Sequence, residues 1–355
     1  MKEELKILYH MPSLDTIYAQ RTIYYGFKNA FESMGHKFYT FTSNDNLKKV
    51  LNEVNPDIFM TATHFYYQKY LDLKLLDIYR RNGLFMLTKI DFWNSPILKY
   101  RINEAASLKH EKNKIDMIKS GLLGDVFYHV IEQGDPRMEG FYEETSKRFE
   151  TIPLAADKTI MYYDFDRSFE CDITYIGTNL PQKKIFFKER LFPLYNMYNL
   201  KIYGQDWKFY EKLLGLMQRT GQYYNIKLLE KIQKPKLKLE DERKIYSSAK
   251  ISVNIHEDYQ RRFGGDVNER FFKILACKGF QITDHVNWID KYFDSNEIVC
   301  AKTKEEWFGK IDHFLDNPEK RKKIAKNGCN KVLKHHTYHN RVNQILQIYK
   351  RFERT

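Results

Sequence analysis

The chain has 355 residues, 43% of them hydrophobic and 15% aromatic, which is enough apolar material for two domain cores. Its formal net charge is +13, and this basic balance excludes a strongly acidic or disordered class of protein. No run of about 18 apolar residues and no secretory leader occurs, so we expect a cytoplasmic protein.

The N-terminal part alternates between short apolar runs and amphipathic segments. Because the crossovers between the apolar runs are short, the pattern predicts a parallel sheet with right-handed connections. The apolar runs predict strands at residues 6–10, 37–42, 57–63 and 84–90, and the helical spacing predicts helices at residues 23–34, 46–54 and 70–81.

Polar residues lie at the ends of three of these predicted strands. His10 ends the first strand, His64 and Asp91 come directly after the third and fourth strands, and Trp93 lies two residues beyond Asp91. Parallel strands end at one edge of a sheet, so we expect these residues to share one rim. His64 and Asp91 are candidates for a general base, although each could instead cap a strand end or a turn.

A domain boundary is expected near residue 155, in an extended connector that contains Pro153. Before it, residues 97–120 have a charged helical pattern. The second half repeats the alternation, with a lysine-rich loop or excursion at residues 221–242. Further strands are predicted at residues 126–131, 171–176, 200–203 and 297–301, and helices at residues 138–149, 182–194, 243–249 and 304–315 and from Pro318.

The stretch from Lys250 to Asp284 carries the strongest functional signal. It predicts a buried strand, a charged loop with Arg261 and Arg262, a helix from Asn268 and a second strand. Ligands of open α/β sheets bind beyond the carboxyl ends of the strands, where a helix N-terminus favours anions. We therefore expect this stretch to bind a diphosphate.

Motifs for other functions are weak or absent. Neither GxGxxG nor GxxxxGK[ST] occurs, which argues against dehydrogenases and P-loop enzymes. The four cysteines lack the spacing of a zinc site, and the histidines at 335–339 lack a carboxylate partner.

Several fragments between about residues 150 and 345 resemble the C-terminal domain of CgeB-like glycosyltransferases, which are similar to the family-4 type of the GT-B fold. The resemblance rests on Asn254, the segments 268–273 (NERFFK) and 276–280 (ACKGF), His336-Thr337-Tyr338 with Arg341, and the shorter fragments at 154–157, 172–177, 203–204 and 297–298.

The resemblance implies an α/β protein with two Rossmann-like domains that face one another across a cleft. Residues 1–155 would bind the acceptor, residues 156–335 the nucleotide sugar, and residues 336–355 would form a helix that returns to the first domain. The donor, which we expect to be a UDP-sugar, would be a co-substrate, with no cofactor and no metal. The acceptor would be a surface glycan, a lipid-linked sugar or a protein.

The expected site residues follow from this layout. Arg270, with Asp91 and His64, would be catalytic. Donor binding is expected at Gly177, Thr178, Asn179, Tyr203, Gly204, Asn254, His256, Arg261, Arg262, Asn268, Arg270 and Lys273, and acceptor binding at His10, His64, Asp91 and Trp93.

Lys273 departs from the family pattern. Many relatives have a glutamate there that holds the donor ribose, and lysine cannot accept those hydrogen bonds. Either Asp266, Glu269 or Asp284 replaces it, or Lys273 contacts phosphate, or the donor contact is altered.

Two alternatives remain at this stage. Asp164 and Asp166 form a DxD pair that would bind a divalent ion in a metal-dependent glycosyltransferase. Residues 318–355 hold eleven Lys or Arg against two Glu, a net charge of +9. That segment could contact the inner face of a membrane, or bind nucleic acid, although no recognised nucleic-acid module is present and we expect no such partner.

Overall fold

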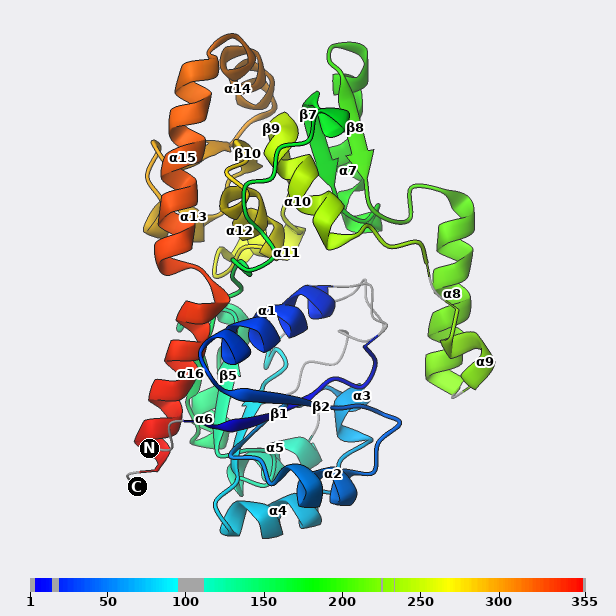
Figure 1. The fold of residues 1–355 in the computed structure, drawn as a ribbon, viewed down its shortest axis with the longest axis vertical. Coiled ribbons are helices and arrows are strands. Elements are labelled where there is room, and N and C mark those ends of the chain that lie inside the picture. Colours follow the sequence, from blue (N-terminus) through cyan, green and yellow to red (C-terminus); the bar gives the residue numbers. More distant parts are fainter. Residues whose placement is uncertain (1–3, 15–18, 95–111, 225, 233, 354–355) are drawn as a thin grey trace. The chain divides into compact units, whose positions relative to one another are not determined.

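The computed structural model describes residues 4–14, 19–94, 112–224, 226–232 and 234–353, which form two compact units (Figure 1). Unit 1 is built mainly from the chain up to Leu154 and from Tyr338 onwards, and unit 2 is Ala155–Thr337. Within the described ranges, no helix has the length and apolar character needed to cross a membrane. All four cysteines are free thiols, and Cys171 and Cys277 are buried.

Unit 1 contains a six-stranded parallel sheet with the strand order β2-β1-β3-β4-β5-β6. Its strands are short runs of aliphatic and aromatic residues, and every residue of β3 is buried, as in sheets covered on both faces. The elements are β1 (Lys6–His10), α1 (Ala19–Ser33), β2 (Lys37–Phe41), α2 (Leu47–Val54), β3 (Ile58–Ala62), α3 (Phe65–Gln68), α4 (Leu73–Arg81), β4 (Phe85–Lys89), α5 (Lys112–Lys119), β5 (Val126–His129), η3 (Pro136–Met138), α6 (Phe141–Thr145) and β6 (Phe149–Thr151).

Local capping decides where these helices begin and end. The side chains of Asn46 and Asp72 accept hydrogen bonds from the first turns of α2 and α4, so α4 starts at Leu73 and not at the expected Tyr70. Gly35 lies two residues beyond the end of α1 and has a left-handed conformation, with φ of 87°, which turns the chain away from the helix.

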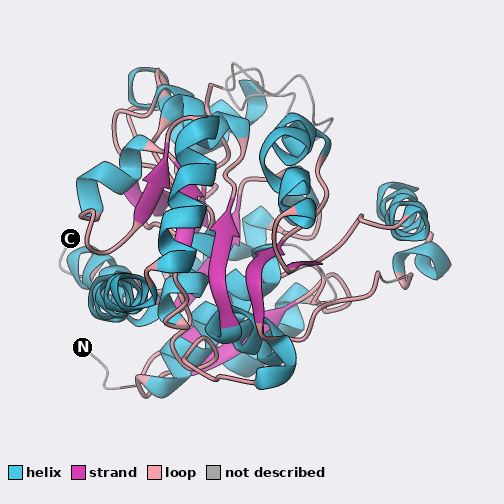
Figure 2. Cartoon of the chain, turned by 90° about the horizontal axis from the view of Figure 1, so that it is seen from above, coloured by secondary structure: helices cyan, strands magenta, loops and turns pink. Residues whose placement is uncertain are grey.

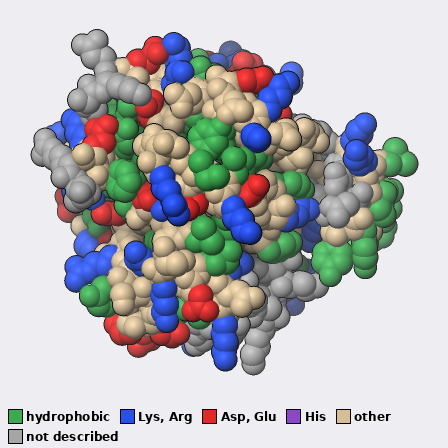
Figure 3. Space-filling model, turned by 90° about the horizontal axis from the view of Figure 1, so that it is seen from below, with side chains coloured by type: hydrophobic (Ala, Val, Ile, Leu, Met, Phe, Trp, Pro, Cys, Tyr) green, Lys and Arg blue, Asp and Glu red, His purple; other side chains and the backbone are tan. Residues whose placement is uncertain are grey.

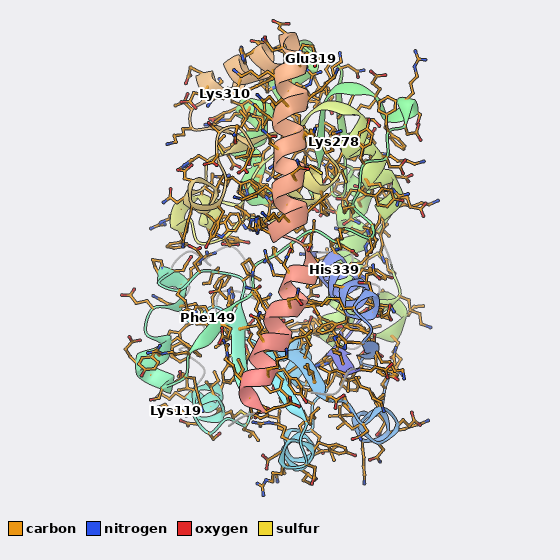
Figure 4. All side chains as sticks on the ribbon, turned by 60° about the vertical axis from the view of Figure 1, so that its left-hand side comes forward. Lys119, Phe149, Lys278, Lys310, Glu319 and His339 are labelled. Carbon is orange, nitrogen blue, oxygen red and sulfur yellow. The ribbon has the colours of Figure 1, made fainter. Side chains whose placement is uncertain are left out.

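The last helix, α16 (Tyr338–Phe352), belongs to unit 1. The ring of Tyr349 lies 5.5 Å from that of Phe85 in β4, and Arg341 Nε donates to the carbonyl of Pro153 at 2.8 Å. His339, labelled in Figure 4, places Nε2 2.7 Å from Ser33 Oγ of α1.

Unit 2 contains a five-stranded parallel sheet with the order β11-β10-β9-β7-β8. Its core includes Ile173, Ile251, Ile282 and Trp307, all fully buried. The elements are η4 (Arg167–Phe169), β7 (Cys171–Ile176), η5 (Pro181–Lys183), α7 (Lys184–Phe186), η6 (Phe187–Leu191), η7 (Phe192–Asn196), β8 (Leu200–Tyr203), α8 (Phe209–Tyr224), α9 (Lys227–Glu230), α10 (Leu239–Ser248), β9 (Ala249–Asn254), α11 (Asp258–Phe263), α12 (Glu269–Ala276), β10 (Gln281–Asp284), α13 (Asn287–Tyr292), β11 (Val299–Ala301), α14 (Lys304–Asp316) and α15 (Pro318–His335).

Some predicted elements are wrong in extent. The helix expected at residues 138–149 is limited to α6, because Ser146 turns left-handed with φ of 57° and Phe149, labelled in Figure 4, starts an additional strand. The helix expected at residues 182–194 is broken into short turns, including a π-helical turn before Pro193. Most of the helical segment expected at residues 97–120 lies outside the described residues.

Candidate functional site

The strand order of the unit 2 sheet reverses between β7 and β9, and this position is the switch point of the sheet. From β7 the chain proceeds to β8 on one side, and then to β9, β10 and β11 on the other. In doubly wound sheets of this order, the crevice beyond the carboxyl ends of the two central strands is the ligand site. Gly177 follows β7 and Asn254 ends β9, so these two residues lie at that position.

Arg270 links the two strand ends. Its Nη1 donates to Asn254 Oδ1 at 3.1 Å, and its guanidinium lies over the ring of Tyr175 at 5.0 Å from the centroid. A Cβ built on Gly177 would approach Arg270 Nη2 to 2.5 Å and Tyr175 Oη to 2.6 Å. A larger residue at this position would therefore displace Arg270 or Tyr175 from its present place.

A second glycine supports the same loop. Gly204, directly after β8, has φ of 117°, and a Cβ there would lie 2.3 Å from the carbonyl oxygen of Gly177. The Gly177 amide donates to the carbonyl of Tyr203 at 2.9 Å, and the Asn179 amide donates to that of Gln205 at 2.9 Å. These contacts fix the backbone of residues 177–179, including Thr178, at the end of β7.

Helix α12 begins at this strand edge. Asn268 caps it, with Oδ1 accepting from the Phe271 amide at 3.1 Å and Nδ2 donating to the carbonyl of Ile255 at 3.3 Å. The cap therefore ties the start of α12 to the residue that follows β9. The partial positive charge of a helix N-terminus adds to the charge of Arg270 in the first turn.

Lys183 is a residue that the sequence reasoning missed. Its side chain is buried, and Nζ donates to the carbonyl of Ile255 at 2.8 Å. Burial, with a further contribution from nearby Arg270, lowers the pKa of Lys183 to about 7. Nothing in the sequence separates Lys183 from the adjacent Lys184, which is exposed.

His256 forms a buried cluster with Asp284 and Arg261. His256 Nδ1 donates to Asp284 Oδ1 at 2.7 Å, while Arg261 Nη1 donates to Asp284 Oδ2 at 2.8 Å and to the His256 carbonyl at 2.6 Å. Burial alone would raise the pKa of Asp284, but His256 and Arg261 lower it well below its usual range. His256 Nε2 is buried and has no hydrogen-bond partner among the described residues.

The other cations of the charged stretch lie in different surroundings. Arg262 is exposed, with its guanidinium 5.7 Å from the ring centroid of Phe263. Lys273 is buried, and its Nζ lies 2.6 Å from Glu242 Oε1 of α10 and 3.4 Å from Glu269 Oε1 of α12. Burial lowers the pKa of Lys273, but the two carboxylates outweigh it and raise the pKa.

The three acids considered as replacements for a ribose-binding glutamate are all engaged. Glu269 pairs with Lys273, and Asp284 pairs with His256 and Arg261. Asp266 accepts a hydrogen bond from Gln260 Nε2 at 2.8 Å. The ribose contact therefore stays unassigned.

In unit 1, His64 and Asp91 are electrostatic neighbours. His64 caps α3, with Nδ1 accepting from the Tyr66 amide at 3.3 Å, and the Asp91 amide donates to Thr63 Oγ1 at 2.9 Å. Burial raises the pKa of the Asp91 carboxyl, although His64 is the leading influence in the opposite direction. A carboxylate with a raised pKa suits a general base.

His10 and Trp93 are core residues. His10 is buried between Phe41 and Tyr67, its Nδ1 lies 3.0 Å from Thr61 Oγ1, and burial lowers its pKa to about 3. Trp93 is fully buried, with its ring 5.5 Å from that of Phe141. Their expected acceptor contacts stay predictions.

The DxD carboxylates are both ion-paired. Asp164 Oδ2 accepts from Arg243 Nε at 2.8 Å, and Asp166 Oδ2 lies 3.2 Å from Lys244 Nζ. In the part of the chain that the structure describes, no group of three or more His, Cys, Asp or Glu side chains could hold a metal ion.

Comparisons with known proteins relate this chain to glycosyltransferases by sequence and by fold. Residues 184–347 match the family model described as glycosyl transferase-like. A search of curated protein sequences found no match. The structure is similar to that of sucrose-phosphate synthase from Thermosynechococcus elongatus, with a TM-score of 0.62, 12% identity and coverage of 98% of this chain and 99% of the other.

Two further solved structures are similar over nearly the whole chain. A glycosyltransferase from Rickettsia africae has a TM-score of 0.62 and 13% identity, with 99% of each chain covered. An α-glucosyltransferase in complex with UDP and a 13-mer DNA has a TM-score of 0.64 and 11% identity, with 98% of this chain and 100% of that chain covered. The chain therefore has the GT-B fold, and residues 184–347 are similar to glycosyl transferase-like domains.

Proposed function

We propose that this protein is a metal-independent glycosyltransferase that moves a sugar from a nucleotide diphosphate, UDP, to a hydroxyl of a glycan, lipid-linked or protein acceptor. The observation that carries the proposal is Arg270, held by Asn254 against Gly177 at the switch point of the unit 2 sheet. Similar structures contain UDP or, in a starch synthase from Arabidopsis thaliana, ADP.

The residues of unit 2 supply what a leaving diphosphate requires. Arg270 can form charge-assisted hydrogen bonds to phosphate oxygens, and the start of α12 provides backbone N–H groups. Lys183, held nearby through the carbonyl of Ile255, supplies a second cation when it is protonated. Two fixed cations stabilise the charge that develops on the leaving group without a metal ion.

The donor-binding roles of the remaining residues follow from their places. Gly177, Thr178, Asn179, Tyr203 and Gly204 shape the loop at the ends of β7 and β8. His256 and Arg261, joined through Asp284, shape the loop after β9. The expected donor contacts of Arg262 and Lys273 remain predictions, because Arg262 is exposed and Lys273 is paired with glutamates.

For the acceptor we propose that Asp91 accepts the hydroxyl proton and that His64 assists it. Their support is the pKa of Asp91, which burial raises, and the electrostatic interaction of Asp91 with His64. We also retain the CgeB-like subtype and the cytoplasmic location as proposals.

A thermal-shift panel of UDP, GDP, dTDP and CDP tests the donor class. A ligand that binds only the folded state raises its stability, by about 2.7 kcal/mol at a hundredfold excess over Kd. We expect UDP to raise Tm by several degrees, on the order of 2–4 °C per kcal/mol, with or without EDTA. The proposal fails if no nucleotide shifts Tm, and its metal independence fails if the shift needs a divalent ion.

A further inference from the structure

The helix pair α8–α9 is an unusual part of unit 2. It is inserted between β8 and α10, and Figures 1 and 2 both show it projecting from the unit. We call residues Lys208–Lys231 the α8–α9 excursion. It carries large apolar side chains that are mostly exposed: Phe209 (84%), Leu216 (56%), Tyr223 (71%) and Leu228 (78%).

The polarity of α8 is inverted with respect to an ordinary surface helix. Glu211, Gly215, Gln218 and Gly221, spaced four, three and three residues apart, are its buried positions. Helices of soluble proteins normally bury their apolar stripe and expose the polar one. Phe209, Leu213, Leu216 and Tyr223 instead lie on the exposed face of α8.

Specific contacts at the base of the excursion hold this orientation. Gln205 Nε2 donates to the carbonyl of Pro235 at 2.8 Å, and Lys234 Nζ forms a buried ion pair with Asp206. Lys234 crosses α8 at Gly215, where a Cβ would overlap its Cε. The polar face of α8 is therefore fixed inwards, and the apolar face is fixed outwards.

The charged side chains that the structure describes as exposed on the excursion have one sign. Glu211 is buried, so the described side chains exposed on the excursion include cations but no carboxylate. Hydrophobic and cationic side chains cover the projection at the right of Figure 3. The exposed cations are Lys208, Lys212, Arg219, Lys227 and Lys231.

We propose that the α8–α9 excursion is a membrane-surface anchor that inserts its aromatic and leucine side chains at the interface of a bilayer containing anionic lipids. Apolar rings and leucines flanked by lysine and arginine are the composition of helices that lie in a bilayer interface. Anionic headgroups complement the five cations, whereas pairing with a second copy would oppose cation to cation. The anchor does not depend on the proposed enzymatic activity.

The basic C-terminal segment is a weaker candidate for the same contact. Helix α15 has many lysines, but its only large hydrophobic side chain that is exposed is Leu333, at 41%. Charge without apolar side chains gives electrostatic attraction but no insertion. Leu333 is therefore a matched control, since it lies among lysines on an exposed helix of the same unit.

Flotation of the full-length protein with vesicles tests the proposal. Vesicles of equimolar phosphatidylcholine and phosphatidylglycerol are compared with vesicles of phosphatidylcholine alone. We expect the wild type to float with the anionic vesicles. The partition coefficient of the double variant Leu216→Glu/Tyr223→Glu should be lower by a factor of about ten or more. Leu333→Glu should float like the wild type, and all variants should keep the same Tm because the changed side chains are exposed.

Three results would overturn the proposal. The first is equal flotation of the wild type with both kinds of vesicle, and the second is a loss of flotation in Leu333→Glu as large as that in the double variant. The third is that no protein floats and that sedimentation velocity shows a dimer, which Leu216→Glu/Tyr223→Glu dissociates. The last result would assign the surface to a second copy of the chain. Donor turnover is measured separately, so a protein that floats but has no activity contradicts only the proposed function.

Discussion

Lys183 shows how one buried cation can connect the proposed chemistry with stability. Its pKa of about 7 means that the folded protein holds the proton less tightly than the unfolded chain, whose lysine titrates near 10.4. Between these two values the unfolded state binds more protons, so this group makes the protein more stable as pH rises from about 7 towards 10. Below pH 7 Lys183 is protonated in both states, so the folded protein is destabilised by the full cost of burying this charge.

Lys183→Met should therefore raise Tm at neutral pH and flatten the rise of stability above pH 7. If Lys183 contacts the diphosphate, the same variant should bind UDP about tenfold to a hundredfold more weakly, the loss of one charge-assisted hydrogen bond. Differential scanning fluorimetry across pH and calorimetric titration with UDP measure the two effects. Lys184→Met is the control, since the neighbouring side chain is exposed.

An unchanged UDP affinity in Lys183→Met would remove Lys183 from the donor site. A lower Tm would show that its bond to the Ile255 carbonyl stabilises the fold by more than burial of its charge costs. Sequence reasoning could not find this residue, because burial of one of two adjacent lysines depends on the tertiary path of η5. Arg270, by contrast, could be proposed from the sequence, since it lies two residues after the predicted helix start at Asn268.

At the scale of elements, Lys273 joins α12 to α10. Its Nζ lies between Glu242 and Glu269, and Tyr246 Oη donates to Glu242 at 3.1 Å. A lysine at this position is therefore balanced by a carboxylate on a neighbouring helix. The departure from the family pattern thus has a structural partner that lies 31 residues away in the sequence.

Lys273→Glu should destabilise unit 2 by about 3–5 kcal/mol, because it leaves three carboxylates together in a buried place. The exchange Glu242→Lys/Lys273→Glu restores opposite charges and should recover most of that loss. Urea unfolding of the single and double variants measures both. Exchange of the exposed pair Lys322 and Glu319 serves as a control and should change stability by less than about 1 kcal/mol. A double variant no more stable than Lys273→Glu would contradict the pairing.

Element prediction succeeded where a continuous apolar run had clear ends. Strands β1, β7 and β8 begin and end at the predicted residues. Element prediction failed where the apolar residues of a segment are not buried or where a short helix lies within a charged stretch. Helix α8 was missed because its glycines lower helix propensity and its apolar residues do not mark a buried face, and residues 261–263 were expected in a loop but end α11.

At the scale of the whole molecule, strand and helix alternation was sufficient to predict two doubly wound sheets. Both are wholly parallel, and in both the chain proceeds from the first strand to one side and then to the other. In unit 1, His10 is the last residue of β1, and His64 and Asp91 lie two residues beyond the ends of β3 and β4. Their surroundings differ, because His10 is part of the core while Asp91 and His64 interact electrostatically.

The central claim is that the strand ends of unit 2 bind the diphosphate of a nucleotide sugar through Arg270. Its most direct test is turnover of UDP-sugars by Arg270→Ala, with circular dichroism and Tm to verify the fold. Lys250→Ala is the matched control, since Lys250 is an exposed cation near the start of β9, away from the end of that strand at Asn254, and is paired with Asp172. We predict that Arg270→Ala lowers turnover on the order of 100-fold or more while Lys250→Ala retains it. A correctly folded Arg270→Ala enzyme with wild-type turnover would contradict the account.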